Sequence, residues 1–115
     1  MHEFSLAAQI VETVTEQAKQ REASSVLTLE IEIGTLSGVV REALDFALQE
    51  AIKNSVLENA EIKLTEVQAK AICKGCNHTF ELDDFFGTCT RCQSMEYEII
   101  AGKELKIKSF RIDSV

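Results

Sequence analysis

Cys73-Lys-Gly-Cys76 and Cys89-Thr-Arg-Cys92 are the two stretches that decide how this chain of 115 residues is interpreted. They hold all four of its cysteines, as two C-x2-C pairs with twelve residues between them. Each pair can bind one side of a metal ion, and two pairs complete the tetrahedron of thiolates that structural Zn2+ prefers. The spacing leaves room for a short hairpin. We therefore predict a structural zinc site in a zinc ribbon, although rubredoxin-type iron sites use the same spacing.

The charge of the chain limits its partners. The formal net charge is −7 at pH 7, and four thiolates around a divalent ion add a further charge of about −2. Nucleic acids and anionic membranes are bound through basic patches. Near the cysteines the basic residues are Lys70, Lys74 and Arg91, and acidic residues lie close to them in the sequence. We therefore expect a protein that binds neither nucleic acid nor a membrane.

The cysteine pairs also indicate a reducing compartment. Residues 1–20 show an amphipathic pattern with charged residues rather than a signal peptide, and no apolar run approaches the length of a membrane span. C-x2-C pairs without an export signal are typical of reduced metal sites rather than of disulfides. We therefore expect a cytoplasmic protein.

Hydrophobic periodicity predicts two helices and a first strand. Apolar residues at steps of 3 and 4 predict a first helix of about five turns. Alternation predicts a half-buried strand from Val26 to Ile33. A second helical stripe follows Ser37, which is the expected N-cap, and ends near Asn54. The apolar positions are Phe4, Ala7, Val11, Val14 and Ala18 in the first helix, Leu27, Leu29, Ile31 and Ile33 in the strand, and Val40, Leu44, Ala47, Leu48, Ala51 and Ile52 in the second helix.

The second half of the chain predicts strands that change face. Ala60 to Ile72 alternates, but its apolar set shifts by one position near Glu66, which requires a bulge or a bend. Residues 97–101 and 104–112 form two further predicted strands. The order strand, helix, strand from Val26 to Ile72 predicts parallel strands joined by a crossover helix. The expected fold is therefore α+β: two helices on a small mixed β-sheet, with an inserted four-cysteine zinc-ribbon module.

The first three residues form a candidate site for a second metal. In Met1-His2-Glu3 the terminal amine, the intervening amide nitrogen and the imidazole can form fused chelate rings, and the Glu3 carboxylate can supply a fourth donor. A square-planar set of nitrogen and oxygen donors is what Ni2+ or Cu2+ favours. Such a site is pH-sensitive and exchangeable, which suits a carrier. The alternative is an incidental histidine in a frayed terminus.

Little else in the chain suggests chemistry. With two histidines and no phosphate-binding loop, no nucleophile arrangement can be built, and a closed four-thiolate site leaves no open metal position. We therefore expect a protein that is not an enzyme. His78 is expected to be a solvated turn residue, with a role as a zinc ligand or a pH sensor as the alternative. Phe85 and Phe86 are expected in the core of the small module, with an exposed contact surface as the alternative.

Three features occur together in this chain. They are the start Met1-His2-Glu3 followed by Phe-Ser-Leu, the strand end Ile33-Gly34, and the paired C-x2-C motifs. In this combination the whole sequence resembles the HypA/HybF family of hydrogenase maturation factors. The resemblance implies a nickel metallochaperone that delivers Ni2+ during maturation of NiFe-hydrogenase. It also implies two partners, a GTPase accessory protein and the hydrogenase large-subunit precursor, and in some organisms urease accessory proteins.

The resemblance also implies residue roles. Exchangeable Ni2+ is held by His2, with the Met1 amine and Glu3. Structural Zn2+ is held by Cys73, Cys76, Cys89 and Cys92. The strand pattern assigns residues 1–67 and 105–115 to a nickel-binding domain and residues 68–104 to a zinc-binding domain.

The chain departs from the family pattern in two places. Val40 stands where many relatives carry an acidic residue, and Glu42, two positions on, is expected to point elsewhere. Cys92 is followed by Gln93 rather than by a histidine. Two alternatives stay open. The chain could be a zinc-ribbon interaction adaptor that transfers no nickel, and its long strands could pair or swap between two chains in a homodimer.

Overall fold

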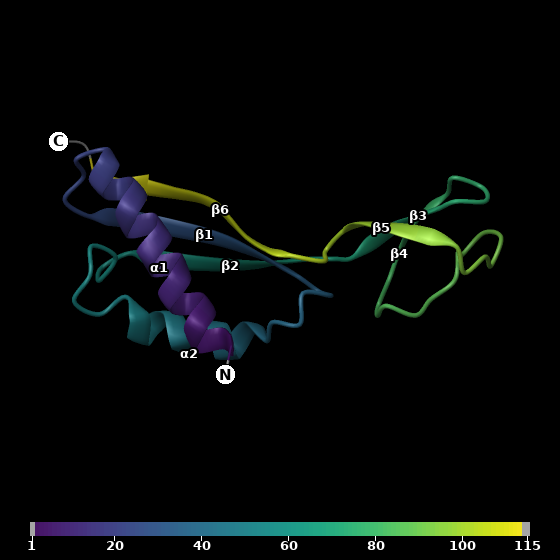
Figure 1. Cartoon of the computed structure of the whole chain (residues 1–115), viewed down its shortest axis with the longest axis horizontal. Coiled ribbons are helices and arrows are strands. Elements are labelled where there is room, and N and C mark those ends of the chain that lie inside the picture. The colour runs from purple at the N-terminus through teal and green to yellow at the C-terminus, as the bar shows by residue number, and fades with distance from the viewer. Residues whose placement is uncertain (1, 114–115) are drawn as a thin grey trace. The chain divides into compact units, whose positions relative to one another are not determined.

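A computed structural model describes residues 2–113 of the chain. Two helices and six strands follow one another in the order shown in Figure 1. The elements are α1 (His2–Gln20), β1 (Val26–Gly34), α2 (Arg41–Ala51), β2 (Glu61–Val67), β3 (Lys70–Cys73), β4 (Thr79–Glu81), β5 (Tyr97–Ala101) and β6 (Leu105–Ile112). None of the helices in the described part of the chain is long and apolar enough to cross a membrane.

Helix α1 follows the predicted apolar stripe except at Phe4, which is exposed. Its buried residues are Ala7, Ile10, Val11, Val14 and Ala18. The helix ends in a Schellman motif, because Ala23 N–H donates to Ala18 O at 3.0 Å and Glu22 N–H donates to Lys19 O at 3.0 Å. Glu22 takes the left-handed position of this motif with φ 57°. Glycine usually occupies that position, so the helix end carries some backbone strain.

Two details of the sequence prediction are wrong at β1 and α2. Leu27 is exposed and Val26 is buried, so the strand alternates regularly only from Leu29 onward. Ser37 is not the N-cap of α2: Val40 takes that position without a side-chain cap. The Ser37 hydroxyl instead accepts a hydrogen bond from Val39 N–H at 3.3 Å. A serine hydroxyl can accept a hydrogen bond in a local turn as well as at a helix start. The sequence pattern alone does not distinguish these two roles.

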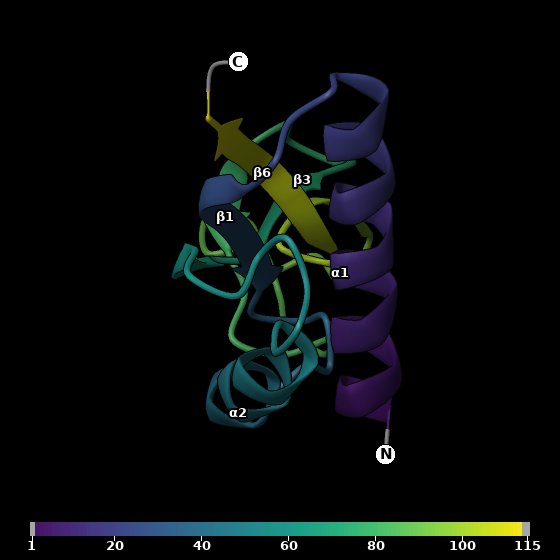
Figure 2. The ribbon, with the colours of Figure 1, turned by 90° about the vertical axis from the view of Figure 1, so that its left-hand side faces the viewer.

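The first sheet has the strand order β2-β1-β6. In Figure 1, β1 and β2 run in the same direction and β6 runs back in the opposite direction, so this sheet is mixed. Helix α2 lies between β1 and β2 in the chain, which confirms the predicted strand–helix–strand unit with parallel strands. Figure 2 shows α1 from the side and α2 nearly end-on, so the two helices cross steeply. Near the chain start they meet through Phe4 and Phe46, whose rings lie edge to face at 6.1 Å.

The second sheet corrects one prediction. Residues 60–72 do not form a single bent strand: β2 ends at Val67 and β3 begins at Lys70 in a different sheet, with the order β4-β3-β5. Both neighbours pair with β3 in antiparallel fashion. The predicted change of face is therefore the point at which the chain leaves one sheet and enters another. A further irregularity lies between Lys70 and Ala71, opposite β5.

The structure divides the chain into two compact units. The first contains residues 1–31, 40–65 and 106–115, and the second contains residues 32–39 and 66–105. The second unit thus contains the four cysteines, strands β3 to β5, the last residues of β1 and β2, and the segment after β1. Whether the units are independent domains that bind nickel and zinc stays a prediction.

Three chain segments cross within the second unit and are joined by backbone hydrogen bonds. Gly34 N–H donates to Glu104 O at 2.9 Å, and Leu36 N–H donates to Gly102 O at 2.9 Å. Thr35 N–H donates to Val67 O at 3.0 Å. A Cβ on Gly34 would overlap the Gly102 carbonyl and lie 2.9 Å from Glu104 O. Glycine is therefore required here by close backbone approach. We call residues 34–36, 67–69 and 102–104 the crossing point.

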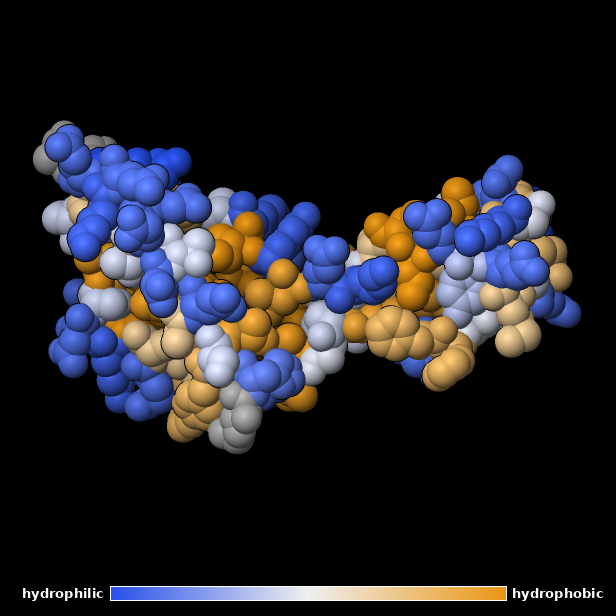
Figure 3. All heavy atoms as spheres, viewed as in Figure 1, coloured by the Kyte–Doolittle hydropathy of each residue, from blue (hydrophilic) through white to orange (hydrophobic). Residues whose placement is uncertain are grey.

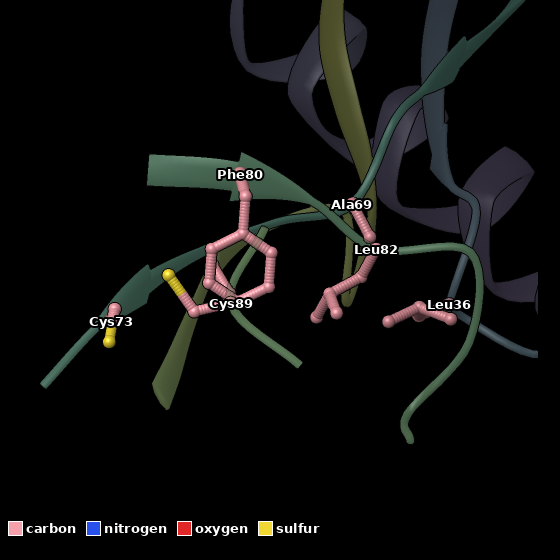
Figure 4. Close-up of a cluster of buried hydrophobic side chains, with 7 residues drawn as sticks. Leu36, Ala69, Cys73, Phe80, Leu82 and Cys89 are labelled. Atoms are coloured by element: carbon pink, nitrogen blue, oxygen red, sulfur yellow. The ribbon is translucent and has the colours of Figure 1, made fainter. Parts of the chain in front are cut away.

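The core of the second unit is small and includes two of the cysteines. Figure 4 shows Phe80 beside Cys89 and Leu82 extending toward Leu36. The cluster consists of Leu36, Ala69, Ala71, Cys73, Phe80, Leu82 and Cys89, with Cys76, Tyr97 and Ile99 packed against it. Phe85 and Phe86 are both exposed, so their predicted place in this core is wrong. A core of this size needs a metal or another cross-link for stability.

Candidate metal centre

The four cysteines form one compact group of sulfur atoms. The Sγ atoms of Cys73, Cys76, Cys89 and Cys92 all lie within 4.8 Å of one another. Two of the distances are 3.5 Å, between Cys73 and Cys92, and 3.6 Å, between Cys76 and Cys89. A tetrahedral ion with metal–sulfur bonds of about 2.3 Å separates its sulfurs by about 3.8 Å. The sulfurs are therefore close to the spacing that such an ion requires.

The two C-x2-C pairs have the same backbone structure. In each, the first cysteine N–H donates to a carbonyl five residues on, and the residue four positions on donates back to the cysteine carbonyl. That donor residue is in the left-handed region, which allows the chain to reverse within one turn. The bonds are Cys73 to His78 O, Asn77 to Cys73 O, Cys89 to Ser94 O and Gln93 to Cys89 O, all 2.9 Å, with φ 62° at Asn77 and 64° at Gln93.

Each turn also directs N–H groups at a sulfur. Gly75 N–H lies 3.3 Å from Cys73 Sγ, and Arg91 N–H lies 3.4 Å from Cys89 Sγ. Hydrogen bonds of this kind favour a negatively charged acceptor. The backbone therefore prepares the first sulfur of each pair to act as a thiolate ligand. The spacing of the cysteines predicts that the four sulfurs bind one metal ion, but these N–H donors become visible only in the structure.

The four thiols differ in acidity. Burial raises the pKa of Cys89, but the N–H groups of Cys92 and of the residue before it lower this pKa overall to about 6. The Cys76 N–H is the main cause of the lowered pKa of Cys73. At Cys92 the Ser94 N–H acts downward, yet the neighbouring thiols raise the pKa overall to about 12. Four thiolates need a cation, so a bound metal ion displaces the protons that remain on the group.

His78 lies beside this group without joining it. Its Nε2 is 3.1 Å from Thr90 Oγ1, and its ring stacks on Phe80 with centroids 6.4 Å apart. Among the described residues, the metal-binding group contains the four cysteines alone. The His78–Thr90 contact connects the loops that carry the two cysteine pairs. The sequence analysis did not single out Thr90. Its position in the sequence gives no indication that it contacts His78.

The second candidate site lies at the start of α1. His2 Nε2 is 3.7 Å from Glu3 Oε2, and the side chains of the two residues are 62% and 17% exposed. The structure therefore brings together two of the three residues that the sequence singled out. Met1, the third, lies outside the described residues. Because α1 begins at His2, the N–H groups of its first turn have no acceptor within the helix.

Val40 and Glu42 lie in the same unit as this site. Val40 is exposed at the N-cap of α2, and Glu42 lies in the first turn of that helix. Glu42 borders a surface hollow of about 320 Å3. The hollow is lined by Arg41, Glu42, Asp45, Ile62 and Leu64.

In the described residues, two helices, a mixed sheet, a small antiparallel sheet and a compact four-cysteine group define a small metal-binding protein. The chain belongs to the HypA family, whose description is hydrogenase/urease nickel incorporation, metallochaperone, and whose model matches residues 1–112. The family resemblance inferred from the sequence is thereby confirmed. By this description, its members are metallochaperones for nickel incorporation.

Curated relatives and solved structures agree with this assignment. The chain is 46% identical over 112 residues to a hydrogenase maturation factor HypA of Parabacteroides distasonis, and the match covers 97% of both chains. It is 38% identical over 113 residues to a HypA of Chlorobium phaeobacteroides, covering 98% of this chain and all of the relative. A solution structure of a HypA protein superposes with TM-score 0.74 at 26% identity, covering 97% of this chain and 96% of that one. The fold also matches the Helicobacter pylori nickel metallochaperone HypA, with TM-score 0.69, 23% identity and 96% coverage of both chains.

Proposed function

We propose that this protein is a nickel metallochaperone that binds Ni2+ at its N-terminus and delivers it during maturation of NiFe-hydrogenase. The observation that carries the proposal is the exposed His2 beside the partly buried Glu3 at the start of α1, in a chain of the HypA family. The imidazole, the His2 amide nitrogen and the Met1 amine form the nickel-binding set, with the Glu3 carboxylate as a further donor. Nitrogen and oxygen donors in this arrangement suit Ni2+.

The helix start favours an exchangeable site. The first N–H groups of α1 have no acceptor within the helix, so ligation through the His2 amide breaks no helical hydrogen bond. The positive end of the helix dipole opposes a bound cation, and the nearby Glu3 carboxylate offsets part of that repulsion. His2 is well exposed, which leaves a path for a receiving protein. These features support a site that captures and releases Ni2+ without chemical turnover.

The four cysteines have a different role in this proposal. They hold structural Zn2+, which stabilises the small core of the second unit. A site closed by four thiolates binds a soft or borderline ion tightly and gives no position for transfer. Keeping the two metals apart by ligand type allows the protein to retain zinc while it hands over nickel.

The family description covers nickel incorporation into hydrogenase and urease. We infer that the protein acts in the cytoplasm with a GTPase accessory protein and the hydrogenase large-subunit precursor, and with urease accessory proteins where a urease is present. It carries no catalytic step of its own in this account. A homodimer stays a proposal that sedimentation analysis can check.

The test is a nickel titration of zinc-loaded protein with its native N-terminus. We expect one nickel per chain and its loss in His2→Ala or when one residue is added before Met1. Glu3→Gln should weaken nickel binding without abolishing it. His78→Ala is the matched control and should bind nickel as the native protein does. Unchanged nickel binding in His2→Ala would remove the basis of the terminal site and favour a zinc-ribbon adaptor instead.

A further inference from the structure

The loop after β4 exposes two adjacent phenylalanines. Phe85 is 52% exposed and Phe86 is 90% exposed. Phenylalanine is among the residues most often found inside proteins. We call residues 83–88 the diphenylalanine loop. Figure 3 shows that hydrophobic side chains reach the surface of the second unit between hydrophilic ones. The aromatic side chains of this loop do not serve the core of that unit, so they need another explanation.

The loop is held in one conformation by the core beneath it. The Tyr97 hydroxyl donates to Phe85 O at 2.7 Å and accepts from Gly87 N–H at 3.1 Å, so one side chain fixes the backbone on both sides of Phe86. Phe86 N–H donates to Asp84 Oδ1 at 2.7 Å. The Tyr97 ring packs edge-on against the buried Phe80 at 5.5 Å. An exposed aromatic residue on a fixed backbone loses little conformational freedom when it binds a partner.

The start of the loop is acidic in sequence. Asp83 and Asp84 directly precede the two phenylalanines and are exposed. The nearest basic residues along the chain are Lys74 and Arg91. Glu81 stands opposite Lys70 in the β3–β4 pair, which offsets its charge in part. The loop therefore presents an apolar tip with a negative border.

The negative charge of this border limits which kinds of surface could bind the aromatic tip of the loop. A second copy of the chain in a symmetric contact would bring the same acidic border against itself. An anionic membrane surface would repel the border as well. An apolar pocket bordered by Lys and Arg on another protein satisfies both the aromatic tip and the carboxylates.

We propose that the diphenylalanine loop docks into an apolar pocket, bordered by basic residues, on a protein that takes part in nickel delivery. Phe86 enters the pocket, Phe85 covers its edge, and Asp83 faces the basic border. The proposal depends on the proposed function only for the identity of the partners to be tested. Those partners are the GTPase accessory protein and the hydrogenase large-subunit precursor of the same organism.

The test measures the affinity of zinc-loaded full chain for each of the two purified proteins by calorimetry. The double variant Phe85→Ala/Phe86→Ala should bind one of them at least about tenfold more weakly. Asp83→Lys should weaken binding and reduce its dependence on salt. Met95→Ala is the matched control, because Met95 is also in the second unit and is 77% exposed. It should leave the affinity unchanged. Zinc content and circular dichroism establish that each variant is folded.

Several outcomes would overturn the proposal: no binding of the native protein to either partner, equal affinity of the double variant, or an equal loss in Met95→Ala. Self-association or binding to anionic vesicles that the double variant abolishes would assign the loop to a second copy or to a lipid surface. Nickel titration separates this inference from the proposed function. The double variant should still bind one nickel at its N-terminus. Failure of the native protein to bind nickel there would contradict the proposed function itself.

Discussion

Gly34→Ala tests the crossing point that joins three segments of the second unit. A Cβ at this position would overlap the Gly102 carbonyl and approach Glu104 O to 2.9 Å. Both atoms are backbone acceptors: Gly102 O receives Leu36 N–H, and Glu104 O receives Gly34 N–H, each at 2.9 Å. Relief of the overlap must therefore displace two acceptors of hydrogen bonds. Each bond contributes a net 0.5–1.5 kcal/mol, roughly, and a buried group left without a partner costs more. We expect a loss of about 2–4 kcal/mol in the free energy of unfolding.

Gly38→Ala is the matched control for this change. Gly38 has φ +80°, and a Cβ there would meet no atom within 4 Å. Its substitution should cost only the strain of a left-handed alanine, about 1–2 kcal/mol. Urea unfolding gives the two free energies, and hydrogen exchange at the Leu36 amide reports on the crossing point directly. Protection of that amide should fall in Gly34→Ala alone. Equal losses in the two variants, with the Leu36 amide still protected in both, would refute the argument from close approach.

Three further predictions concern the metal centre and α1. Cys73→Ser should abolish zinc binding and disorder residues 66–105 while α1 keeps its helical circular dichroism; loss of the whole helical signal would contradict two separate units. Zinc binding to metal-free protein at pH 7 should release protons, chiefly from Cys76 and Cys92, whose pKa values are raised. The zinc affinity should therefore rise with pH. Calorimetry in buffers of different ionisation enthalpy measures the release, and an affinity independent of pH would contradict it. Glu22→Gly should raise the free energy of unfolding by about 1 kcal/mol, because Glu22 sits at φ 57°. An unchanged midpoint of urea unfolding would show that the left-handed backbone at Glu22 carries no strain.

The metal centre could be predicted from the sequence because its geometry is local. A C-x2-C pair closes a turn within a few residues, so its spacing alone indicates which atoms converge. The helices were predictable for a similar reason, since a stripe at steps of 3 and 4 reports on one face of one element. The family resemblance depended on the same local features, together with Met1-His2-Glu3.

The errors arose where the structure depends on long-range pairing. A shift of the apolar positions after Leu64 looks the same whether a strand contains a bulge or leaves one sheet for another. The break at Gln68 and Ala69 depends on Thr35, whose Oγ1 accepts from Ala69 N–H at 2.9 Å across 34 positions of sequence. Phe85 and Phe86 were assigned to the core because of their type, and no local pattern shows that a hydroxyl twelve residues away turns the loop outward. The two partners of each of these contacts lie too far apart in the chain to fall within one short stretch of sequence.

The central claim is that nickel and zinc occupy separate sites with different ligands. Nickel-edge X-ray absorption of zinc-loaded protein, with its native N-terminus and one equivalent of Ni2+, measures the donors around nickel directly. We predict nitrogen and oxygen donors that include the His2 imidazole, with no thiolate sulfur bound to nickel and with zinc retained. Thiolate sulfur around nickel, or displacement of zinc from the four cysteines, would contradict the account.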